Sequence, residues 1–225
     1  DQRIECPETV AEPVNQWILH ELAQATENTA KAVEAYRFNE AADTIYQFVW
    51  NIYCDWYLEF IKPVLSESEE TKQVARYVLY QALHVLAPFM PFITEELNAK
   101  IFNQNTHLTG ASWPSDIPAG SADTGLSLVV DIISEIRAIR SEMNVPLSAK
   151  PPLLIAGITA EKKAVLEAME PALLRMARLS EITFTSASAD EFEKGTARTN
   201  LHSLDLGLAL AGILDFDAEK ARLAK

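Results

Sequence analysis

Hydrophobic residues recur at helical spacing along most of the first 145 residues, and most densely in Arg37–Pro63. One stripe of that segment is apolar, a second is aromatic, and only a narrow strip is polar. A surface helix of a globular protein buries roughly a third of its circumference, so the pattern predicts a central helix covered on at least two sides. The three sets are Ile45, Phe48, Val49, Ile52, Trp56 and Phe60; Tyr46, Trp50, Tyr53 and Tyr57; and Glu40, Asp43, Gln47, Asn51, Asp55 and Glu59.

Further helices are predicted on both sides of this segment. Pro13 and Pro91 suit the first position of a helix, and Ser66 with Glu69 forms a capping box. A loop rich in Asn, Gly, Pro, Ser and Thr precedes the last helix. The spacing predicts helices over 13–36, 66–86, 91–102 and 125–143, which together form a bundle over residues 1–147.

The pattern changes after Pro146. Short alternating segments at 153–158, 181–185 and within 201–216 predict strands. A helix capped by Thr159 is predicted between the first two, to about residue 179, with a kink at Pro171. Residues 192–199 are polar and predicted to be loose. Residues 148–216 are therefore predicted to form a small α+β subdomain. The charged Ala/Glu/Lys/Arg segment 217–225 predicts the start of a longer coiled-coil helix. The fold class is mainly α.

The net charge of −13 has the wrong sign for a nucleic-acid-binding protein, because phosphate contacts require Lys and Arg. The charge is uneven, however. Residues 1–70 carry 4 cations and 14 acids, a net of −10, whereas residues 137–178 carry 7 cations and 4 acids, a net of +3. A polyanion should meet the second half of the chain first. The alternative is ordinary variation on a solvated acidic surface.

No catalytic or metal-binding motif is recognisable. The histidines at 20, 84, 107 and 202 are scattered, and no glycine-rich phosphate loop or zinc-ligand spacing occurs. Cys6 and Cys54 are isolated and predict reduced thiols. No apolar stretch approaches the roughly 18 residues of a membrane span, and no secretory signal opens the sequence. These features favour a cytoplasmic location and no catalytic or metal site within the chain.

Two groups of residues have the chemistry of RNA contacts. Arg37, Phe38 and Asn39 offer a phosphate ligand, a stacking ring and an amide for a base edge at a helix joint. The alternative is a corner in which Asn39 caps a helix. Arg137, Arg140 and Asn144 place two cations and an amide on one helical ridge. The alternative there is an ordinary exposed helix face.

Four segments of the sequence also carry a family resemblance. They are RFNEAA, YQFVW, CDWYLE and KP within Arg37–Pro63; LAPFMPFITEEL from Leu86 to Leu97; IRAIRSEMNVP from Ile136 to Pro146; and LAGILD from Leu210 to Asp215. In this order they resemble the anticodon-binding region of the valyl-tRNA synthetase family.

That resemblance implies a class I anticodon-binding helical bundle whose partner is the anticodon stem-loop of valine tRNA, with no DNA or membrane partner. It implies a parent enzyme, expected to be a monomer, that joins valine to its tRNA through valyl-adenylate with ATP and magnesium and hydrolyses mischarged tRNA. The catalytic and editing signatures of the family are absent here, so no activity and no cofactor are expected of this segment. Composition alone leaves an alternative, a non-catalytic helical protein-interaction module.

Overall fold

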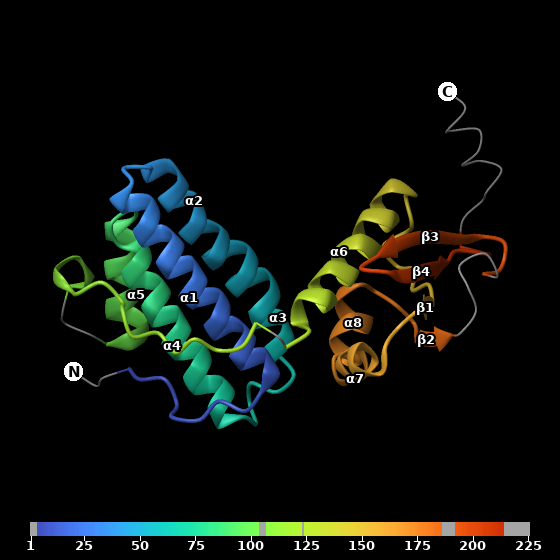
Figure 1. Ribbon diagram of the computed structural model, residues 1–225, viewed down its shortest axis with the longest axis horizontal. Coiled ribbons are helices and arrows are strands. Elements are labelled where there is room, and N and C mark those ends of the chain that lie inside the picture. The colour runs from blue at the N-terminus through green and yellow to red at the C-terminus, as the bar shows by residue number, and fades with distance from the viewer. Residues whose placement is uncertain (1–3, 104–106, 123, 186–191, 214–225) are drawn as a thin grey trace. The chain divides into compact units, whose positions relative to one another are not determined.

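The computed structural model describes residues 4–103, 107–122, 124–185 and 192–213 of the 225-residue chain. The chain divides into two compact units, residues 1–124 and 125–225, drawn blue to green and yellow to red in Figure 1. The fold is mainly helical, as predicted, and the second unit contains a four-stranded sheet. The predicted start of a coiled coil at residues 217–225 lies outside the described residues.

The first unit is a helical bundle. Helix α1 contacts α2, the π-helix η1 and α4, and α5 packs against α4. The segments α2, η1 and α3 follow one another without a break and form the predicted central helix (Figure 1). The bounds are α1 Pro13–Glu34, α2 Phe38–Gln47, η1 Phe48–Tyr57, α3 Leu58–Ile61, α4 Glu69–Leu86, α5 Pro91–Phe102 and the 3-10 helix η2 Leu108–Gly110.

The π-helical turns of η1 change which face of the central helix is buried. Up to Phe48 the buried positions follow α-helical spacing, but the next buried residue is Tyr53, five positions on. A π-helix bonds residue i to i+5, so the wider turn brings Tyr53 and Tyr57 inward. The sequence pattern predicted that Ile52 and Trp56 lie in the core and that a second side of the helix is covered. In the structure Ile52 and Trp56 are only half-buried, and Trp50, on the second side, is exposed.

The start of α4 also differs from the prediction. Its N-cap is Ser68, whose Oγ accepts a hydrogen bond from the Thr71 amide at 3.1 Å. The predicted cap, Ser66, lies in a turn that continues from α3, where the amides of Leu65 and Ser68 donate to the carbonyl oxygens of Ile61 and Val64. The capping box at Ser66 is therefore wrong by two residues.

A buried polar network joins three helices of the bundle. Asn15 accepts a hydrogen bond from the Tyr57 hydroxyl at 2.9 Å and donates to Thr71 Oγ1 at 3.1 Å. It also donates to a carboxylate oxygen of Glu70 at 2.9 Å. Because Asn15, Tyr57 and Thr71 are all fully buried, these bonds satisfy groups that would otherwise be costly to bury. The network fixes the start of α1 against η1 and α4.

Glu70 makes the bundle sensitive to acid. Burial by itself raises the pKa of this carboxyl, but hydrogen bonds from Asn15 and from the amides of Ala11 and Glu12 outweigh burial and lower the pKa below its ordinary 4.5. The folded-state pKa is thus below the unfolded one. The resulting stability is fully present above about pH 4.5 and is lost as pH falls through the folded value.

We expect Glu70→Gln to remove this pH dependence. The free energy of unfolding, measured by urea titration between pH 6 and pH 3, should differ most between wild type and variant above pH 4.5, and the difference should shrink in acid. Glu69→Gln is the control, since Glu69 is an exposed neighbour whose carboxylate pairs with Lys72 at 3.3 Å. An unchanged difference at pH 3 would contradict this account of Glu70.

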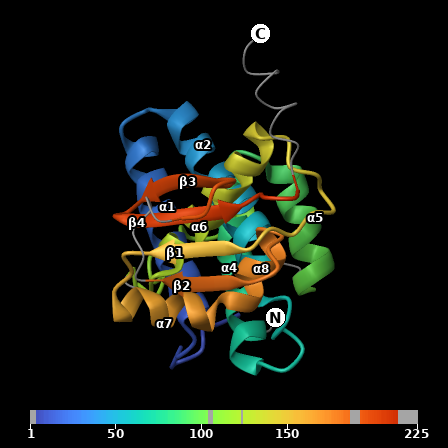
Figure 2. The ribbon, with the colours of Figure 1, turned by 90° about the vertical axis from the view of Figure 1, so that its right-hand side faces the viewer.

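The second unit holds a mixed sheet. The strands lie in the order β2-β1-β4-β3, with β1 and β2 parallel and the other pairs antiparallel (Figure 2). The bounds are α6 Leu126–Glu142, β1 Leu153–Ala156, α7 Ala160–Ala168, α8 Glu170–Met176, β2 Ile182–Thr185, β3 Thr196–Leu201 and β4 Leu204–Ala209.

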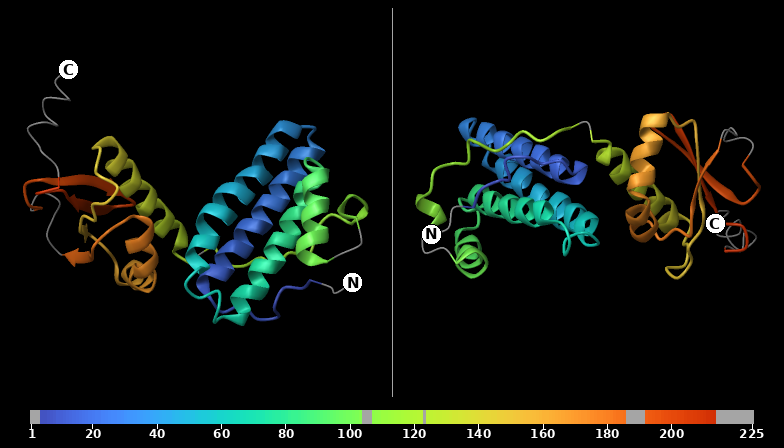
Figure 3. Two further views of the ribbon diagram at one scale, coloured as in Figure 1. Left: turned by 180° about the vertical axis from the view of Figure 1, so that it is seen from behind. Right: turned by 90° about the horizontal axis from the view of Figure 1, so that it is seen from below.

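The helices of this unit lie against one face of the sheet (Figure 3, right). Leu153 and Ile155 of β1 pair with Leu208 and Leu206 of β4, and all four are buried. On the same face, Thr199 of β3 donates a hydrogen bond to Glu135 of α6 at 2.7 Å. Alternation of apolar and polar residues places the core under the helices, as expected for a sheet covered on one side.

Two predictions for this unit need correction. The segment 192–199, predicted to be loose, contains the beginning of β3, which a two-residue turn connects to β4. His202 and Ser203 form this turn with positive φ values of 50° and 65°. The helix predicted over 160–179 with a kink at Pro171 is instead two helices, because α7 ends at Ala168 and Pro171 lies at the start of α8, where proline is tolerated.

Helix α6 was placed in the bundle by the predicted domain boundary at residue 147, whereas in the structure it belongs to the second unit. Its side chains bond to later parts of the chain. Arg137 Nε donates to the carbonyl oxygen of Met176 at 3.2 Å, and Glu135 accepts from Thr199. These partners lie 39 and 64 residues after Arg137 and Glu135, so the local pattern of α6 does not reveal them.

Candidate nucleic-acid interface

The joint between α1 and α2 brings Arg37, Phe38 and Asn39 together on the surface. All three are exposed. Tyr36 has a left-handed backbone with φ of 58°, and the Arg37 amide donates to the carbonyl oxygen of Ala32 at 2.8 Å, which ends α1. Arg37 is the N-cap residue of α2. Asn39 lies inside the first turn, so the alternative interpretation, in which Asn39 caps the helix, is wrong.

The side chains of this joint suit a single-stranded nucleic acid. The rings of Tyr36 and Phe38 meet edge to face with centroids 6.2 Å apart. Such exposed rings can stack on bases, an arginine can bind phosphate, and an amide can reach a base edge. Glu40 forms an ion pair with Arg37 at 3.0 Å. A phosphate that binds Arg37 replaces Glu40 in this pair. Tyr36 was not predicted, although it directly precedes the predicted residues.

The second predicted group lines one shallow pocket of about 620 Å³ at the ends of α6 and α8. Arg137 and Asn144 are exposed there, and Asn144 has a left-handed backbone with φ of 51°. Among the residues that the structure describes, those lining this pocket include no Asp or Glu. They are Arg137, Arg140, Ser141, Asn144, Val145, Pro146, Leu147, Met176, Ala177 and Arg178.

Arg140 does not lie on an exposed ridge as predicted. It is only 7% exposed. Its guanidinium donates to the carbonyl oxygens of Arg178 at 3.3 Å, Pro146 at 3.1 Å and Ala149 at 3.0 Å. Burial lowers the pKa of Arg140, and the nearby charge of Arg178 lowers it further. This side chain shapes the pocket by holding its backbone in place.

Arg178 is the basic residue that the predicted group missed. It is exposed, has a left-handed backbone with φ of 55°, and donates through Nη1 to the carbonyl oxygen of Leu147 at 2.7 Å. Three guanidinium groups thus line a pocket without a described carboxylate, which favours an anion. The fold, through the end of α8, brings Arg178 beside residues of α6 that precede it by about 40 positions.

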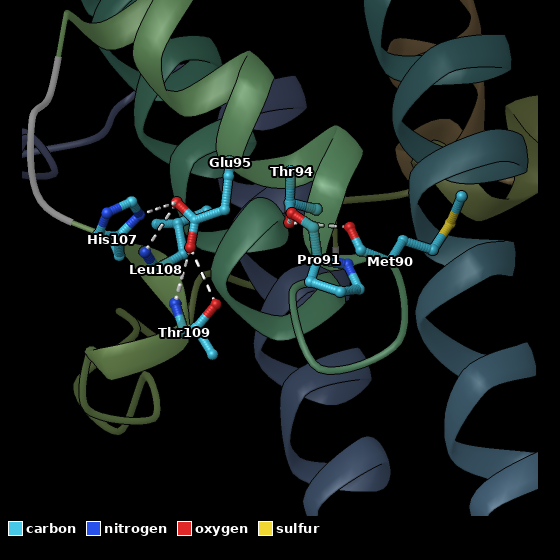
Figure 4. A network of polar contacts seen from close by, with 7 residues as sticks. All are labelled: Met90, Pro91, Thr94, Glu95, His107, Leu108 and Thr109. Carbon is cyan, nitrogen blue, oxygen red and sulfur yellow. Dashed lines mark hydrogen bonds and ion pairs between the residues drawn. The ribbon is translucent and has the colours of Figure 1, made fainter.

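Glu95 of α5 has a structural role that Figure 4 shows. Its carboxylate accepts hydrogen bonds from the amides of Leu108 and Thr109 and from the Thr109 hydroxyl, all at 2.9 to 3.1 Å, and lies 3.6 Å from His107. Burial raises the pKa of Glu95, but these hydrogen bonds outweigh it and lower the pKa overall. The group anchors η2 to α5.

The described part of the chain contains no group of three His, Cys, Asp or Glu residues placed to hold a metal ion. Within the same residues, no helix is long and apolar enough to cross a membrane.

Comparison with known proteins identifies the family. Residues 15–155 match the family described as the anticodon-binding domain of tRNA ligase. This match covers more than half of the chain. The chain belongs to the anticodon-binding domain family of tRNA ligases. The matched region runs from the first turn of α1 through α6 into β1, and so extends across the division between the two compact units.

The family resemblance noted in the sequence is confirmed by similar proteins. The chain is 41% identical to the valine–tRNA ligase of Caulobacter vibrioides over 97% of its length. It is 39% identical to that of Mesorhizobium japonicum over 94%, and 38% identical to that of Rhizobium meliloti over 97%. The chain spans about a quarter of the length of these relatives. Anticodon-binding domains of this family imply tRNA as the partner.

Proposed function

We propose that the chain is the anticodon-binding part of a valine–tRNA ligase and binds the anticodon stem-loop of valine tRNA. The family match over residues 15–155 carries this proposal. The relatives named valine–tRNA ligase support the choice of valine. The exposed joint at Arg37–Asn39 and the arginine-lined pocket at α6 supply suitable chemistry.

In this proposal the two groups have different tasks. Arg37 binds a phosphate, Phe38 and Tyr36 stack on unpaired bases, and Asn39 reaches a base edge. Arg137 and Asn144, with Arg178, hold phosphate or sugar groups at the pocket. Arg140 acts only through the backbone that it positions.

The wider activity belongs to the parent enzyme of the proposal. That enzyme, which we propose to be a monomer, would join valine to its tRNA with ATP and magnesium and hydrolyse mischarged tRNA. We expect the 225-residue chain alone to be inactive in aminoacylation, because its sequence contains neither the catalytic nor the editing signatures of that family. In this proposal the chain binds no cofactor, no DNA and no membrane.

We expect the chain to bind valine tRNA more tightly than a valine tRNA with an altered anticodon. Arg37→Ala should weaken binding about tenfold, equivalent to about 1.4 kcal/mol, and reduce the slope of log affinity against log salt by about one. Fluorescence anisotropy titrations at two or more salt concentrations measure both quantities. Lys100→Ala removes an exposed cation from α5 that, like Arg37, pairs with a glutamate on its own helix, and serves as the matched control.

Three results would contradict parts of this proposal. Equal affinity for both tRNAs would mean that the chain contacts only the RNA backbone. Absence of binding at low salt would favour the alternative from composition, a helical module that binds proteins. Loss of binding in Lys100→Ala as large as in Arg37→Ala would remove Arg37 from the interface.

A further inference from the structure

The central helix presents a second exposed surface, which we call the aromatic–acidic stripe and define as Asp43, Tyr46, Trp50 and Asp55. Tyr46 and Trp50 belong to α2 and η1 and lie one turn apart, with rings that are nearly parallel, 6° between planes and 5.9 Å between centroids. They remain 47% and 57% exposed. An exposed, ordered pair of large rings is typical of the centre of a binding surface.

The acidic side of the stripe follows the same helix at four-residue spacing. Gln47 donates a hydrogen bond to Asp43 Oδ1 at 3.3 Å, and Asn51 donates to the side-chain oxygen of Gln47. These bonds order the polar strip beside the rings. Asp55, one turn beyond Asn51, is exposed. The stripe therefore combines two rings with two exposed carboxylates along about three turns.

The cations of the central helix itself do not neutralise the stripe. Arg37, before it, pairs with Glu40 at 3.0 Å, and Lys62, after it, pairs with Glu59. No other Lys or Arg occurs between residues 37 and 62. The helix thus contributes only negative net charge next to Tyr46 and Trp50, which opposes a nucleic acid and favours a cation.

We infer that the aromatic–acidic stripe docks a basic segment of a partner protein. A guanidinium or ammonium group placed over the ring of Trp or Tyr is attracted by the negative face of the ring, and complementary charges on Asp43 and Asp55 set orientation and association rate. The negative charge of the stripe favours binding of a polycation over binding of RNA. This inference does not rest on the proposed tRNA contacts, which use other residues.

A labelled peptide of nine arginines tests the inference, with a peptide of nine glutamates as the negative probe. We expect the 225-residue chain to bind the arginine peptide in fluorescence anisotropy at 150 mM salt, the ionic strength at which screening acts beyond about 8 Å. Trp50→Ala should weaken binding about tenfold. Phe92→Ala removes a ring that is 92% exposed elsewhere in the same unit and should leave binding unchanged. Equal loss in both variants would overturn the inference.

Charge is tested separately, because an acidic protein attracts polycations without a specific site. One double variant carries Asp43→Asn and Asp55→Asn. The control double variant carries Glu34→Gln and Glu67→Gln and so removes two exposed carboxylates from other parts of the bundle. The first pair should weaken peptide binding at least five times more than the second. Equal weakening would show general attraction and overturn the inference. Circular dichroism checks that every variant keeps its helices.

Two further measurements distinguish other occupants. If Trp50→Ala lowers affinity for valine tRNA or for a single-stranded RNA while the arginine peptide binds as before, the stripe faces RNA and the inference fails. If sedimentation shows dimers of the chain that Trp50→Ala dissolves, a second copy covers the stripe and the inference also fails. If Trp50→Ala loses peptide binding and keeps tRNA binding, the inference is supported. If Arg37→Ala loses tRNA binding and Trp50→Ala does not, that result bears only on the proposed function.

Discussion

Replacing Arg140 with alanine is expected to destabilise the second unit by about 3 kcal/mol or more. The substitution removes a charged donor from three carbonyl oxygens, those of Arg178, Pro146 and Ala149. Hydrogen bonds to charged groups each contribute about 1.5 to 3 kcal/mol. The packed aliphatic part of the side chain is lost as well.

This experiment needs a probe other than fluorescence. All four tryptophans and all six tyrosines lie in residues 1–124, so intrinsic fluorescence reports on the first unit alone. Hydrogen exchange of the amides in β1 and β4 measures the second unit directly, and unchanged tryptophan fluorescence shows that the first unit is intact. We expect faster exchange of these amides in Arg140→Ala.

Arg137→Ala is the matched control on the same helix. Arg137 is exposed, and its removal should change the stability of the second unit by at most about 1 kcal/mol. Arg140→Lys should lie between wild type and alanine, because an ammonium group cannot reproduce the planar fork of a guanidinium. Equal protection of β1 and β4 in Arg140→Ala and Arg137→Ala would refute the structural role of Arg140.

The second large effect is expected for Asn15→Ala, which should lower the stability of the bundle by about 3 kcal/mol. The change takes one partner each from the Tyr57 hydroxyl, Thr71 Oγ1 and Glu70, and leaving buried polar groups unpaired costs about 1 to 3 kcal/mol per group. Urea unfolding followed by tryptophan fluorescence measures this change, because the fluorescent residues belong to this unit.

A double-mutant cycle separates the network from the packing of its members. Tyr57→Phe removes only the hydroxyl and should cost about 1 kcal/mol. Because Asn15 and Tyr57 share a hydrogen bond, the cost in the double variant should fall short of the sum of the single costs by 0.5 kcal/mol or more. Strictly additive costs would mean that the bond between them contributes nothing to stability.

The helices were largely predictable from the sequence because their apolar periodicity is local. Pro13 and Pro91 mark the true starts of α1 and α5, and Thr159 caps α7 as predicted. The π-helical part of the central helix was not predictable, because an apolar stripe and an aromatic stripe both offered a face for burial. Only packing against α1 and α4 selects Tyr53 and Tyr57. Likewise β3 forms because β4 pairs with it, despite its polar composition.

Local sequence patterns also predicted one part of the candidate interface better than the other. Arg37, Phe38 and Asn39 are consecutive, so a single helix joint brings them together wherever the rest of the chain lies. The environment of Arg140 depends on backbone atoms up to 38 residues away. Sequence patterns describe side chains and do not show which carbonyl oxygens will surround them. The prediction of tRNA contacts for Arg137 and Asn144 remains open to test, with both side chains accessible.

The π-helical segment Phe48–Tyr57 has a consequence for insertions and deletions in this helix. The step of five residues from Phe48 to Tyr53 is one longer than an α-helical turn allows. A one-residue deletion between them could therefore be absorbed by a return to α-helical geometry with both tyrosines still inward. The same deletion within α1 or α4 would rotate every later side chain by about 100° out of the core. The π-helical segment is thus a place where the length of the central helix can change without loss of the bundle.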